Sequence, residues 1–210
     1  MTNDKISIAL PKGRLAEETL ELFIEKGICE KGVVDFNSRK LIFEDTKNNI
    51  SFLLIRNTDI PPYVEYGAAD LGIVGKDVLL ESECSIYEFL DLGFGYCRLC
   101  SAGIKDGDLS YKHNMKIATK YPHITKDYFA KKGIVVDIIK LYGSIEIAPI
   151  AGLSDIIVDL VSTGETMKKN GLCEIETIME STARLVGNKS LTRAKHSRIK
   201  NILNLLEQDN

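Results

Sequence analysis

The sequence predicts an α/β fold of two similar lobes that face each other across a cleft. Short apolar segments alternate with amphipathic ones, which is typical of β–α–β units. A tetrapeptide that opens on glycine and closes on aspartate occurs twice: Gly67–Asp70 precedes the apolar run Leu71–Val74, and Gly152–Asp155 precedes Ile156–Leu160. Chance is the alternative explanation of this repeat, because short β–α units reuse the same turn residues. No linker rich in proline, serine or like charges divides the chain, so we expect lobes joined by more than one crossing.

The first half of the chain predicts three steps of strand and helix. Residues Lys5–Leu10 alternate apolar and polar side chains, as a half-buried strand does, and the turn Pro11–Arg14 ends that strand. The helix that follows is apolar on one side and ends at Gly27. The other expected elements are strands at Leu41–Phe43, Phe52–Ile55 and Leu71–Val74, a helix that begins at Thr58-Asp59 and ends at Gly67, and a helix that begins at Gly75–Asp77.

The second half follows the same plan and indicates where the lobes divide. Its expected elements are a strand at Lys116–Ala118, a helix from Tyr121 to Gly133, a strand at Ile156–Leu160, a short helix at Thr166–Lys169, a strand at Ala183–Val186 and a terminal helix over 191–206. Residues Glu88–Ile104 predict paired strands that cross between the lobes. We therefore expect residues 1–92 and 182–210 to form lobe I and residues 93–181 to form lobe II.

The composition excludes several classes of protein. Of the 210 residues, 44% are hydrophobic and 27% are charged, which is too apolar for a disordered chain. The 27 Lys and Arg nearly balance the 30 Asp and Glu, so the chain lacks the basic field of a non-specific nucleic-acid binder. No apolar run approaches the ~18 residues of a membrane span, and the N-terminus lacks the pattern of a secretion signal. The five cysteines are an odd number, so we expect reduced thiols and a cytoplasmic location.

The most informative segment follows the strand expected at Ile156–Leu160. It consists of Ser162, Thr163, Gly164, Glu165 and Thr166. A turn of hydroxyl side chains and glycine at the start of a helix offers an anion backbone N–H groups, hydroxyl donors and the positive end of the helix dipole. Gly164 also permits close backbone approach or a positive φ. The pattern predicts a site for a phosphate monoester; the alternative is an ordinary capped helix, because Ser, Thr and Gly are common N-cap residues.

Asp159 lies at the carboxyl end of this strand, where open α/β sheets place their ligands. A carboxylate beside a bound phosphate is explained if it accepts hydrogen bonds from sugar hydroxyls while the turn holds the 5-phosphate. Asp155 lies roughly 13 Å away along an extended strand, so we expect it to begin the strand rather than to bind the ligand.

The run from Glu146 to Met167 resembles the signature of the ATP phosphoribosyltransferase family, with the spacing kept throughout. The turn also looks like the phosphoribosyl-pyrophosphate loop of other phosphoribosyltransferases. Those usually carry a second acidic residue where this chain has Leu160. Further blocks that look like the family extend the resemblance over nearly the whole chain: Ala9–Arg14, Ser38–Leu41, Asp59–Asp70 and Lys116–Tyr121.

This resemblance implies a fold, a reaction and partners. The implied fold is bilobal and related to periplasmic binding proteins. The implied reaction transfers the 5-phosphoribosyl group of phosphoribosyl pyrophosphate to N1 of ATP, which is the first step of histidine biosynthesis. The chain looks like the short form of the family, which works with a regulatory subunit resembling histidyl-tRNA synthetase, and we also expect a homodimer.

The resemblance implies catalytic roles for three cations. Lys12, Arg14 and Arg39 are expected to neutralise the departing pyrophosphate together with Mg²⁺, which pyrophosphate itself brings. No metal ligands from the protein are expected. From the residues alone, the alternative is a solvated turn with local charge pairing. A helix N-terminus disfavours the cations of Lys12 and Arg14, and Glu17 and Glu18 offset this effect in that alternative.

The expected substrate-binding residues include four more positions. Asp159, with Glu146, is expected to hold the ribose hydroxyls. Arg56 follows a strand and is a weaker anion ligand, because an arginine at a strand end is commonly solvated. Tyr121 either stacks on adenine or packs in the core, and the sequence does not decide between them.

Two other patterns are interpreted as structural. Cys97 and Cys100 have redox or zinc spacing, but residues three apart on a strand face opposite sides and no second pair completes a zinc set. The basic residues of the terminal helix are expected to be solvated or to face an oligomer. Two rival functions remain at this point: a bilobal module that binds an anion without chemistry, and a phosphoribosyltransferase that uses another base.

Overall fold

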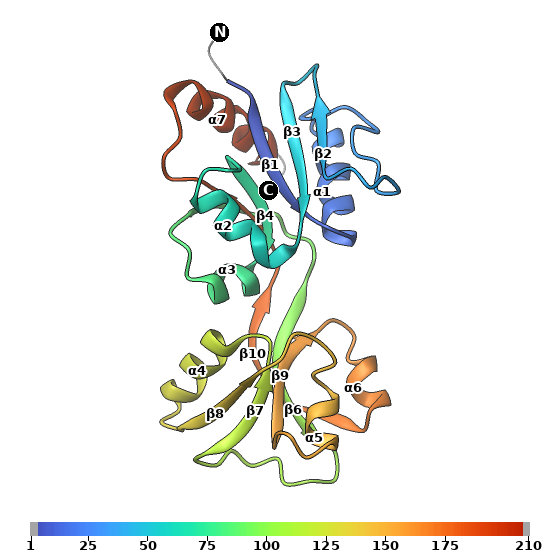
Figure 1. The fold of residues 1–210 in the computed structure, drawn as a ribbon, viewed down its shortest axis with the longest axis vertical. Helices are drawn as coiled ribbons and strands as arrows, with labels where there is room; N and C mark the ends of the chain where they lie inside the picture. The colour runs from blue at the N-terminus through green and yellow to red at the C-terminus, as the bar shows by residue number, and fades with distance from the viewer. Residues whose placement is uncertain (1–3, 208–210) are drawn as a thin grey trace. The chain divides into compact units, whose positions relative to one another are not determined.

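The computed structural model describes residues 4–207, which divide into two compact units. Unit 1 comprises the described residues up to Gly95 and from Thr182 onward, and unit 2 comprises Tyr96–Ser181. Each unit has its own sheet with helices on both faces (Figure 1). The predicted pair of α/β lobes is confirmed.

Unit 1 contains a six-stranded sheet in the order β2-β3-β1-β4-β11-β5. Its strands are β1 (Ile6–Pro11), β2 (Ile42–Asp45), β3 (Ile50–Ile55), β4 (Leu71–Gly75), β5 (Tyr87–Asp91) and β11 (Ala183–Gly187). β1 is parallel to both β3 and β4, whereas β11 is antiparallel to β4 and β5. The carboxyl ends of β1, β3 and β4 therefore meet at one edge of the sheet.

Helices cover both faces of this sheet because its buried side chains alternate between two cores. The helices of unit 1 are α1 (Arg14–Glu25), η1 (Asn57–Asp59), α2 (Ile60–Glu65), α3 (Lys76–Ser82) and α7 (Arg193–Glu207). Ile8 packs in the core beneath α1 and α7, and its neighbour Ala9 packs in the core beneath α2 and α3. Gly72 allows α2 to approach β4, because a Cβ there would lie 2.6 Å from Cγ2 of Ile60.

Unit 2 contains a five-stranded sheet in the order β10-β6-β9-β7-β8. Its elements are β6 (Cys97–Ile104), β7 (Met115–Thr119), α4 (Pro122–Lys131), β8 (Val136–Lys140), α5 (Ile147–Ile150), β9 (Ile156–Val161), α6 (Glu165–Lys169) and β10 (Leu172–Ser181). α4 packs on one face with Ile117 and Val158, and α5 and α6 pack on the other with Ala118 and Ile157. β7 is parallel to β8 and β9.

The two units repeat one topology, as the sequence predicts. Strand order β3-β1-β4-β11-β5 in unit 1 matches β8-β7-β9-β6-β10 in unit 2, and β2 is an addition to unit 1. The helices after β1 and β7 also end alike. Ile28 N–H donates to Phe23 O at 2.8 Å and Ile134 N–H donates to Phe129 O at 2.9 Å, each across a glycine with positive φ.

The two repeated aspartates share a role at the start of a strand. Asp70 Oδ2 accepts a hydrogen bond from Ser7 N at 2.8 Å, and Asp155 Oδ2 accepts one from Lys116 N at 2.7 Å. The expectation that Asp155 begins a strand is confirmed. Asp70 is also buried and paired with Lys195, whose Nζ lies 2.8 Å from both carboxylate oxygens.

Two expectations about elements are wrong. β5 and β6 do not pair with each other: β5 pairs with β11 in one sheet, and β6 pairs with β9 and β10 in the other. The basic face of α7 is not wholly solvated, since Lys195 binds Asp70 and Arg198 donates to the carbonyl oxygens of Asp4, Asn48 and Asn49.

Candidate functional site

The turn after β9 forms an open pocket in unit 2. The pocket has a volume of about 200 Å³ and is lined by residues 160–167. The hydroxyl residues Ser162, Thr163 and Thr166 are exposed. Gly164 adopts φ 76°, the left-handed region that favours glycine, and is the N-cap of α6.

This geometry bears on the alternative of an ordinary capped helix. Because the N-cap residue is glycine, no side chain caps α6. Thr163 Oγ1 accepts a long hydrogen bond from Glu165 N at 3.4 Å, and the Glu165 carboxylate reaches Lys169 Nζ at 3.6 Å. The turn therefore presents hydroxyls that capping does not require.

Asp159 is half-buried at the carboxyl end of β9, next to this turn. One of its carboxylate oxygens accepts a hydrogen bond from Leu160 N at 2.9 Å. Burial raises the pKa of Asp159 above its ordinary value, and the negative charge of Glu146 raises it further. The hydrogen bond from Leu160 and the positive charge of Lys120 oppose this shift in the pKa.

The charge interactions of Asp159 identify the groups that the fold brings together. Glu146 precedes α5, which covers the same face of the sheet as Ile157 on β9. Lys120 follows β7, the strand beside β9. The sequence interpretation assigned no role to Lys120; its signal is the register of two parallel strands, which the sequence alone does not give.

Tyr121 is buried in unit 2. Its side chain is 4% exposed and packs in the core with Ile117 and Phe129. Its backbone N–H donates to Thr119 Oγ1 at 2.9 Å, at the start of α4. This burial favours the packing alternative over adenine stacking.

The predicted cations belong to unit 1. Lys12 and Arg56 follow β1 and β3, whose last residues Pro11 and Ile55 are register partners, so the two cations emerge side by side at one edge of the sheet. Arg14 begins α1 and its Nε lies 3.2 Å from Oε1 of Glu18, with the arginine side chain 71% exposed. The pairing with Glu18 that the solvated-turn alternative expects for Arg14 is therefore present in the structure.

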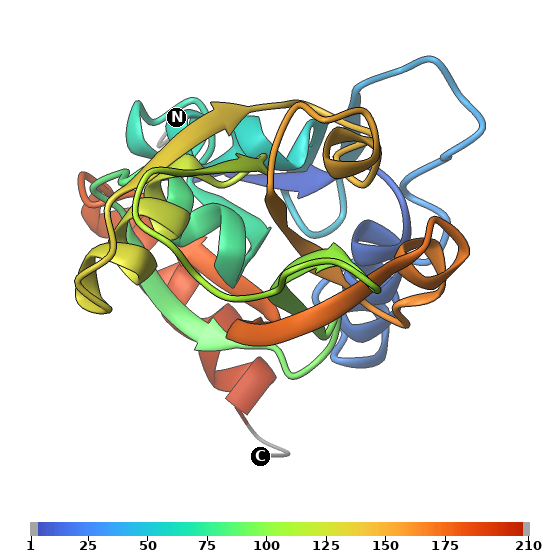
Figure 2. The same ribbon diagram turned by 90° about the horizontal axis from the view of Figure 1, so that it is seen from below.

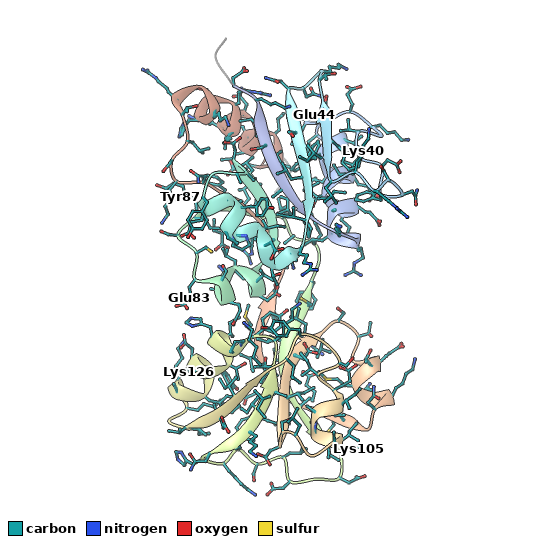
Figure 3. The ribbon with its side chains drawn as sticks, viewed as in Figure 1. Lys40, Glu44, Glu83, Tyr87, Lys105 and Lys126 are labelled. Atoms are coloured by element: carbon teal, nitrogen blue, oxygen red, sulfur yellow. The ribbon has the colours of Figure 1, made fainter. Side chains whose placement is uncertain are left out.

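Arg39 lies apart from these residues in the fold of unit 1. It is exposed on the long connection between α1 and β2, which runs out from the sheet (Figure 2). Lys40 beside it is labelled in Figure 3. The connection has no helix or strand of its own between residues 26 and 41.

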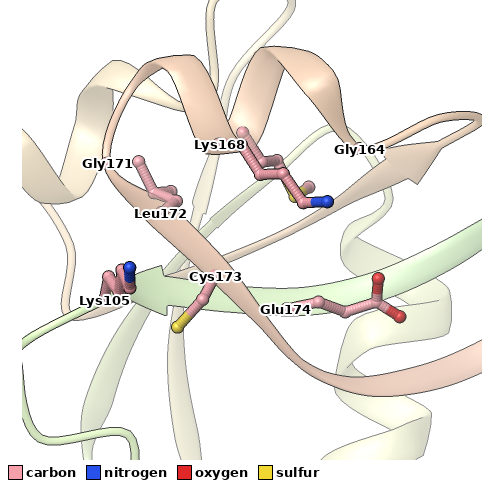
Figure 4. A pocket seen from close by; sticks show the side chains of 8 residues that line it. Lys105, Gly164, Lys168, Gly171, Leu172, Cys173 and Glu174 are labelled. Carbon is pink, nitrogen blue, oxygen red and sulfur yellow. The ribbon is translucent and has the colours of Figure 1, made fainter.

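A second pocket of unit 2 lies between α6 and β10 and has a volume of about 360 Å³ (Figure 4). It shares Gly164 and Met167 with the turn and is otherwise lined by Gly171, two lysines and three residues of β10. Glu174 on its wall accepts hydrogen bonds from Cys100 Sγ at 3.1 Å and Arg98 at 2.9 Å. Burial raises the pKa of Cys100 to about 11, so this thiol is protonated at neutral pH.

The described chain shows no protein-built metal site. Within residues 4–207, no group of three or more His, Cys, Asp and Glu side chains is placed to hold a metal ion. None of the five cysteines, all within this range, forms a disulfide. No helix in this range is long and apolar enough to cross a membrane.

Comparison with known proteins identifies close relatives along the whole chain. Residues 56–208 match the model of a family described as ATP phosphoribosyltransferase. An ATP phosphoribosyltransferase of Geobacter metallireducens is 54% identical over 98% of this chain and 99% of its own length. One of Citrifermentans bemidjiense is 56% identical over 98% of both chains.

Solved structures agree with these relatives. A chain of the "ATP phosphoribosyl transferase (HisG:HisZ) complex" from Thermotoga maritima is similar with a TM-score of 0.82 and 35% identity, over 97% of both chains. The substrate-binding protein of an amino-acid ABC transporter is similar in fold, with a TM-score of 0.59 at 13% identity. This match covers 97% of this chain and 90% of the transporter protein. The predicted relation to periplasmic binding proteins is confirmed at the level of fold.

Proposed function

The chain belongs to the ATP phosphoribosyltransferase family, and we propose roles in that reaction for the residues described above. The enzyme transfers the 5-phosphoribosyl group of phosphoribosyl pyrophosphate to N1 of ATP. The bond between C1 of the sugar and the pyrophosphate oxygen breaks, its electron pair leaves with pyrophosphate, and N1 of adenine bonds to C1. The products are phosphoribosyl-ATP and pyrophosphate, in the first step of histidine biosynthesis.

Unit 2 holds the sugar phosphate in this proposal. The 5-phosphate occupies the turn of Ser162, Thr163, Gly164, Glu165 and Thr166, where exposed hydroxyls surround an open pocket. The Asp159 carboxylate, with Glu146 beside it, accepts hydrogen bonds from the ribose hydroxyls. Fixing the sugar at both ends lowers the entropic part of the barrier.

Unit 1 supplies positive charge for the leaving group. Lys12, Arg14 and Arg39 act on the pyrophosphate, and Arg56 joins them because it emerges beside Lys12. Stabilising charge that grows in the transition state commonly contributes several kcal/mol. Mg²⁺ enters bound to pyrophosphate oxygens, since Mg²⁺ prefers such oxygens and keeps several waters. The side chains assigned to pyrophosphate are lysine and arginine, which do not bind metal ions. They therefore fit a reaction in which the substrate, not the protein, carries the Mg²⁺.

The observation that carries these assignments is the open hydroxyl turn directly after the half-buried Asp159. We would measure pyrophosphate release from ATP, phosphoribosyl pyrophosphate and Mg²⁺, and phosphoribosyl-pyrophosphate affinity by calorimetry. The Thr163→Val variant should bind the sugar at least tenfold more weakly, because a neutral methyl replaces a hydroxyl donor to phosphate. Exposed Thr192→Val on the approach to α7 is the matched control. Equal affinity of the Thr163→Val and wild-type proteins would refute the phosphate assignment.

The same assay addresses the two rival functions. Relatives more than 50% identical over nearly the whole chain favour the enzyme over an anion-binding module. Replacing ATP with GTP should abolish pyrophosphate release, because guanine N1 carries a hydrogen and lacks the free electron pair that attacks C1. Release with other nucleotides at the ATP rate would indicate a transferase for another base.

We also infer a hetero-oligomer with a regulatory subunit resembling histidyl-tRNA synthetase. The similar chain from Thermotoga maritima was solved as a HisG:HisZ complex, which supports this inference. Co-purification with such a subunit from the same genome, followed by light scattering, tests it. The homodimer and the cytoplasmic location stay predictions, and the scattering mass of the chain alone tests the homodimer.

A further inference from the structure

Lys120 and Asp159 occupy neighbouring positions at the carboxyl edge of the unit 2 sheet. β7 and β9 are parallel, and their last register pair is Thr119 with Val158. Lys120 directly follows Thr119, and Asp159 directly follows Val158. Asp159 is on β9 and continues the face of Ile157, which packs beneath α5 and α6, and Lys120 is the bend residue directly after β7. Strands in a sheet lie about 4.8 Å apart, so the backbone positions of the two residues are close, and the charge of Lys120 acts on the Asp159 carboxylate.

Among the residues that the structure describes, the other groups that act on the Asp159 carboxylate carry no positive charge. From α5, Glu146 adds a second carboxylate. From β6, the register partner of Asp159 is Cys100, whose thiol donates to Glu174 on β10. From its own strand, Asp159 receives the N–H of Leu160. Among the charges that act on Asp159, the positive one is that of Lys120.

A half-buried carboxylate beside a second carboxylate takes up a proton readily. A protonated Asp159 would offer one acceptor fewer to the ribose hydroxyls and would lose the charge that strengthens such hydrogen bonds. The cation of Lys120, directly after the neighbouring strand, counteracts both effects. Lys120 is itself half-buried, which keeps solvent screening of the pair low.

We propose that Lys120 is a positioning residue that keeps Asp159 ionised for binding the ribose of phosphoribosyl pyrophosphate. This inference rests on the sugar-binding role of Asp159 proposed above. Lys120 acts through Asp159, so its contribution depends on pH and disappears where Asp159 is ionised without help. A lysine that contacted a phosphate directly would contribute at every pH.

The test compares Lys120→Gln, Lys120→Arg and Lys126→Gln with the wild-type enzyme. Lys126 is exposed on α4 and is the matched control for loss of one lysine of unit 2 (Figure 3). kcat/KM for phosphoribosyl pyrophosphate is measured from pH 5 to 9 at saturating ATP and Mg²⁺, because this ratio reports groups of the free enzyme. Thermal unfolding of each variant verifies that the fold is retained.

In Lys120→Gln the acidic limb of the kcat/KM profile should move to higher pH by about one unit, because the pKa of Asp159 rises when the opposite charge is removed. One unit is the lower end of the effect of a nearby opposite charge on a carboxyl pKa. The profiles should converge with the wild type at alkaline pH, and Lys120→Arg should restore the limb. Lys126→Gln should follow the wild-type profile throughout. An unmoved limb in Lys120→Gln, or a loss of equal size at every pH, would overturn the proposal.

The Asp159→Asn variant separates this inference from the proposed function. If Asp159→Asn has wild-type kcat/KM, the sugar-binding role of Asp159 fails and the role of Lys120 fails with it. If Asp159→Asn is impaired while Lys120→Gln keeps the wild-type limb, only the inference about Lys120 fails.

Discussion

At the scale of the residue, Asp159 shows a functional group held in unfavourable surroundings. Its carboxylate is half-buried and lies near a second carboxylate, and both features raise its pKa. At pH values between the pKa of Asp159 in the unfolded chain and its higher pKa in the native state, Asp159 therefore holds a proton in the native state that the unfolded chain has released. The contribution of Asp159 to the free energy of unfolding is therefore greatest at low pH, and it is lost as the pH rises through the native pKa of Asp159. Ionised Asp159 thus lowers the stability of the protein at neutral pH, a cost explained by its proposed role in binding sugar hydroxyls.

Replacing Asp159 with Asn should therefore stabilise the protein at neutral pH, because the amide cannot ionise. We expect a higher Tm than wild type at pH 7.5 and a difference that shrinks as the pH falls toward 4. The same variant should lose at least tenfold in kcat/KM for phosphoribosyl pyrophosphate. Asp137→Asn, an exposed position on β8, is the control and should change neither quantity. A lower Tm for Asp159→Asn than for the wild type at pH 7.5 would contradict the expected sign of the stability change.

Arg14 and Arg39 illustrate exposed cations that are held by few contacts within the protein. Arg14 is bound by one exposed pair with Glu18, and such a pair within a helix contributes only about 0.3–0.5 kcal/mol. Arg39 is exposed on a connection without secondary structure. Release of either side chain to a pyrophosphate therefore costs little.

Arg14→Ala and Arg39→Ala should each reduce the single-turnover rate at least tenfold, the scale of losing one donor to developing charge. Stability should change little, since both side chains are exposed. Rapid-quench measurement of phosphoribosyl-ATP formation gives the rate, and exposed Arg193→Ala on α7 is the control. A wild-type rate in either variant would remove that arginine from the leaving-group role.

At the scale of the element, strands with local signals were predictable and strands without them were not. β1, β4 and β9 are buried runs bounded by turn residues, and the sequence predicts all three as strands, although it describes β1 as half-buried whereas five of its six residues are buried. β10 shows no strict alternation of burial and has two register irregularities against β6, so its ten residues carry no clean period. β8 is an edge strand with two exposed residues among five. Both strands are fixed by partners distant in sequence.

The helix α7 shows the same limit for side chains. Its basic residues alternate with apolar ones, a pattern typical of a solvated face. The structure turns Lys195 toward Asp70 and Arg198 toward three carbonyl oxygens of unit 1. Both sets of acceptors lie more than 100 residues away in the sequence, so no local pattern reveals them.

Lys195→Met should destabilise the protein by about 3 kcal/mol, because it leaves the Asp70 carboxylate buried without its cation. Exposed Lys200→Met on the same helix should change stability by less than about 0.5 kcal/mol. Urea unfolding followed by circular dichroism measures both. If Lys195→Met and Lys200→Met lose the same stability, the interpretation that Lys195 stabilises the protein by pairing with Asp70 is wrong.

At the scale of the whole molecule, the chain uses one topology twice and adapts each copy. The repeat itself was predictable from Gly67–Asp70 and Gly152–Asp155, because the turn and the first residue of the strand are local features. The differences between the two copies were not predictable from the sequence. Unit 1 adds β2 and α7, and α7 supplies a lysine to its aspartate, whereas unit 2 has no counterpart of α7 among its described elements.

This asymmetry gives matched variants within one molecule. Asp70→Asn and Asp155→Asn each replace the carboxylate that accepts a backbone N–H at the start of a strand. Asp155 is exposed, so its loss of charge should cost about 0.5–1 kcal/mol. Asp70 is buried and leaves Lys195 without its partner, so its replacement should cost about 3 kcal/mol.

Urea unfolding of the two variants measures the difference. Combining Asp70→Asn with Lys195→Met should recover part of the loss, because the double variant buries no unpaired charge. Equal losses for Asp70→Asn and Asp155→Asn would mean that the backbone hydrogen bond, common to both units, carries the effect. A larger loss for Asp70→Asn would show that α7 makes the aspartate of unit 1 the stronger of two equivalent anchors.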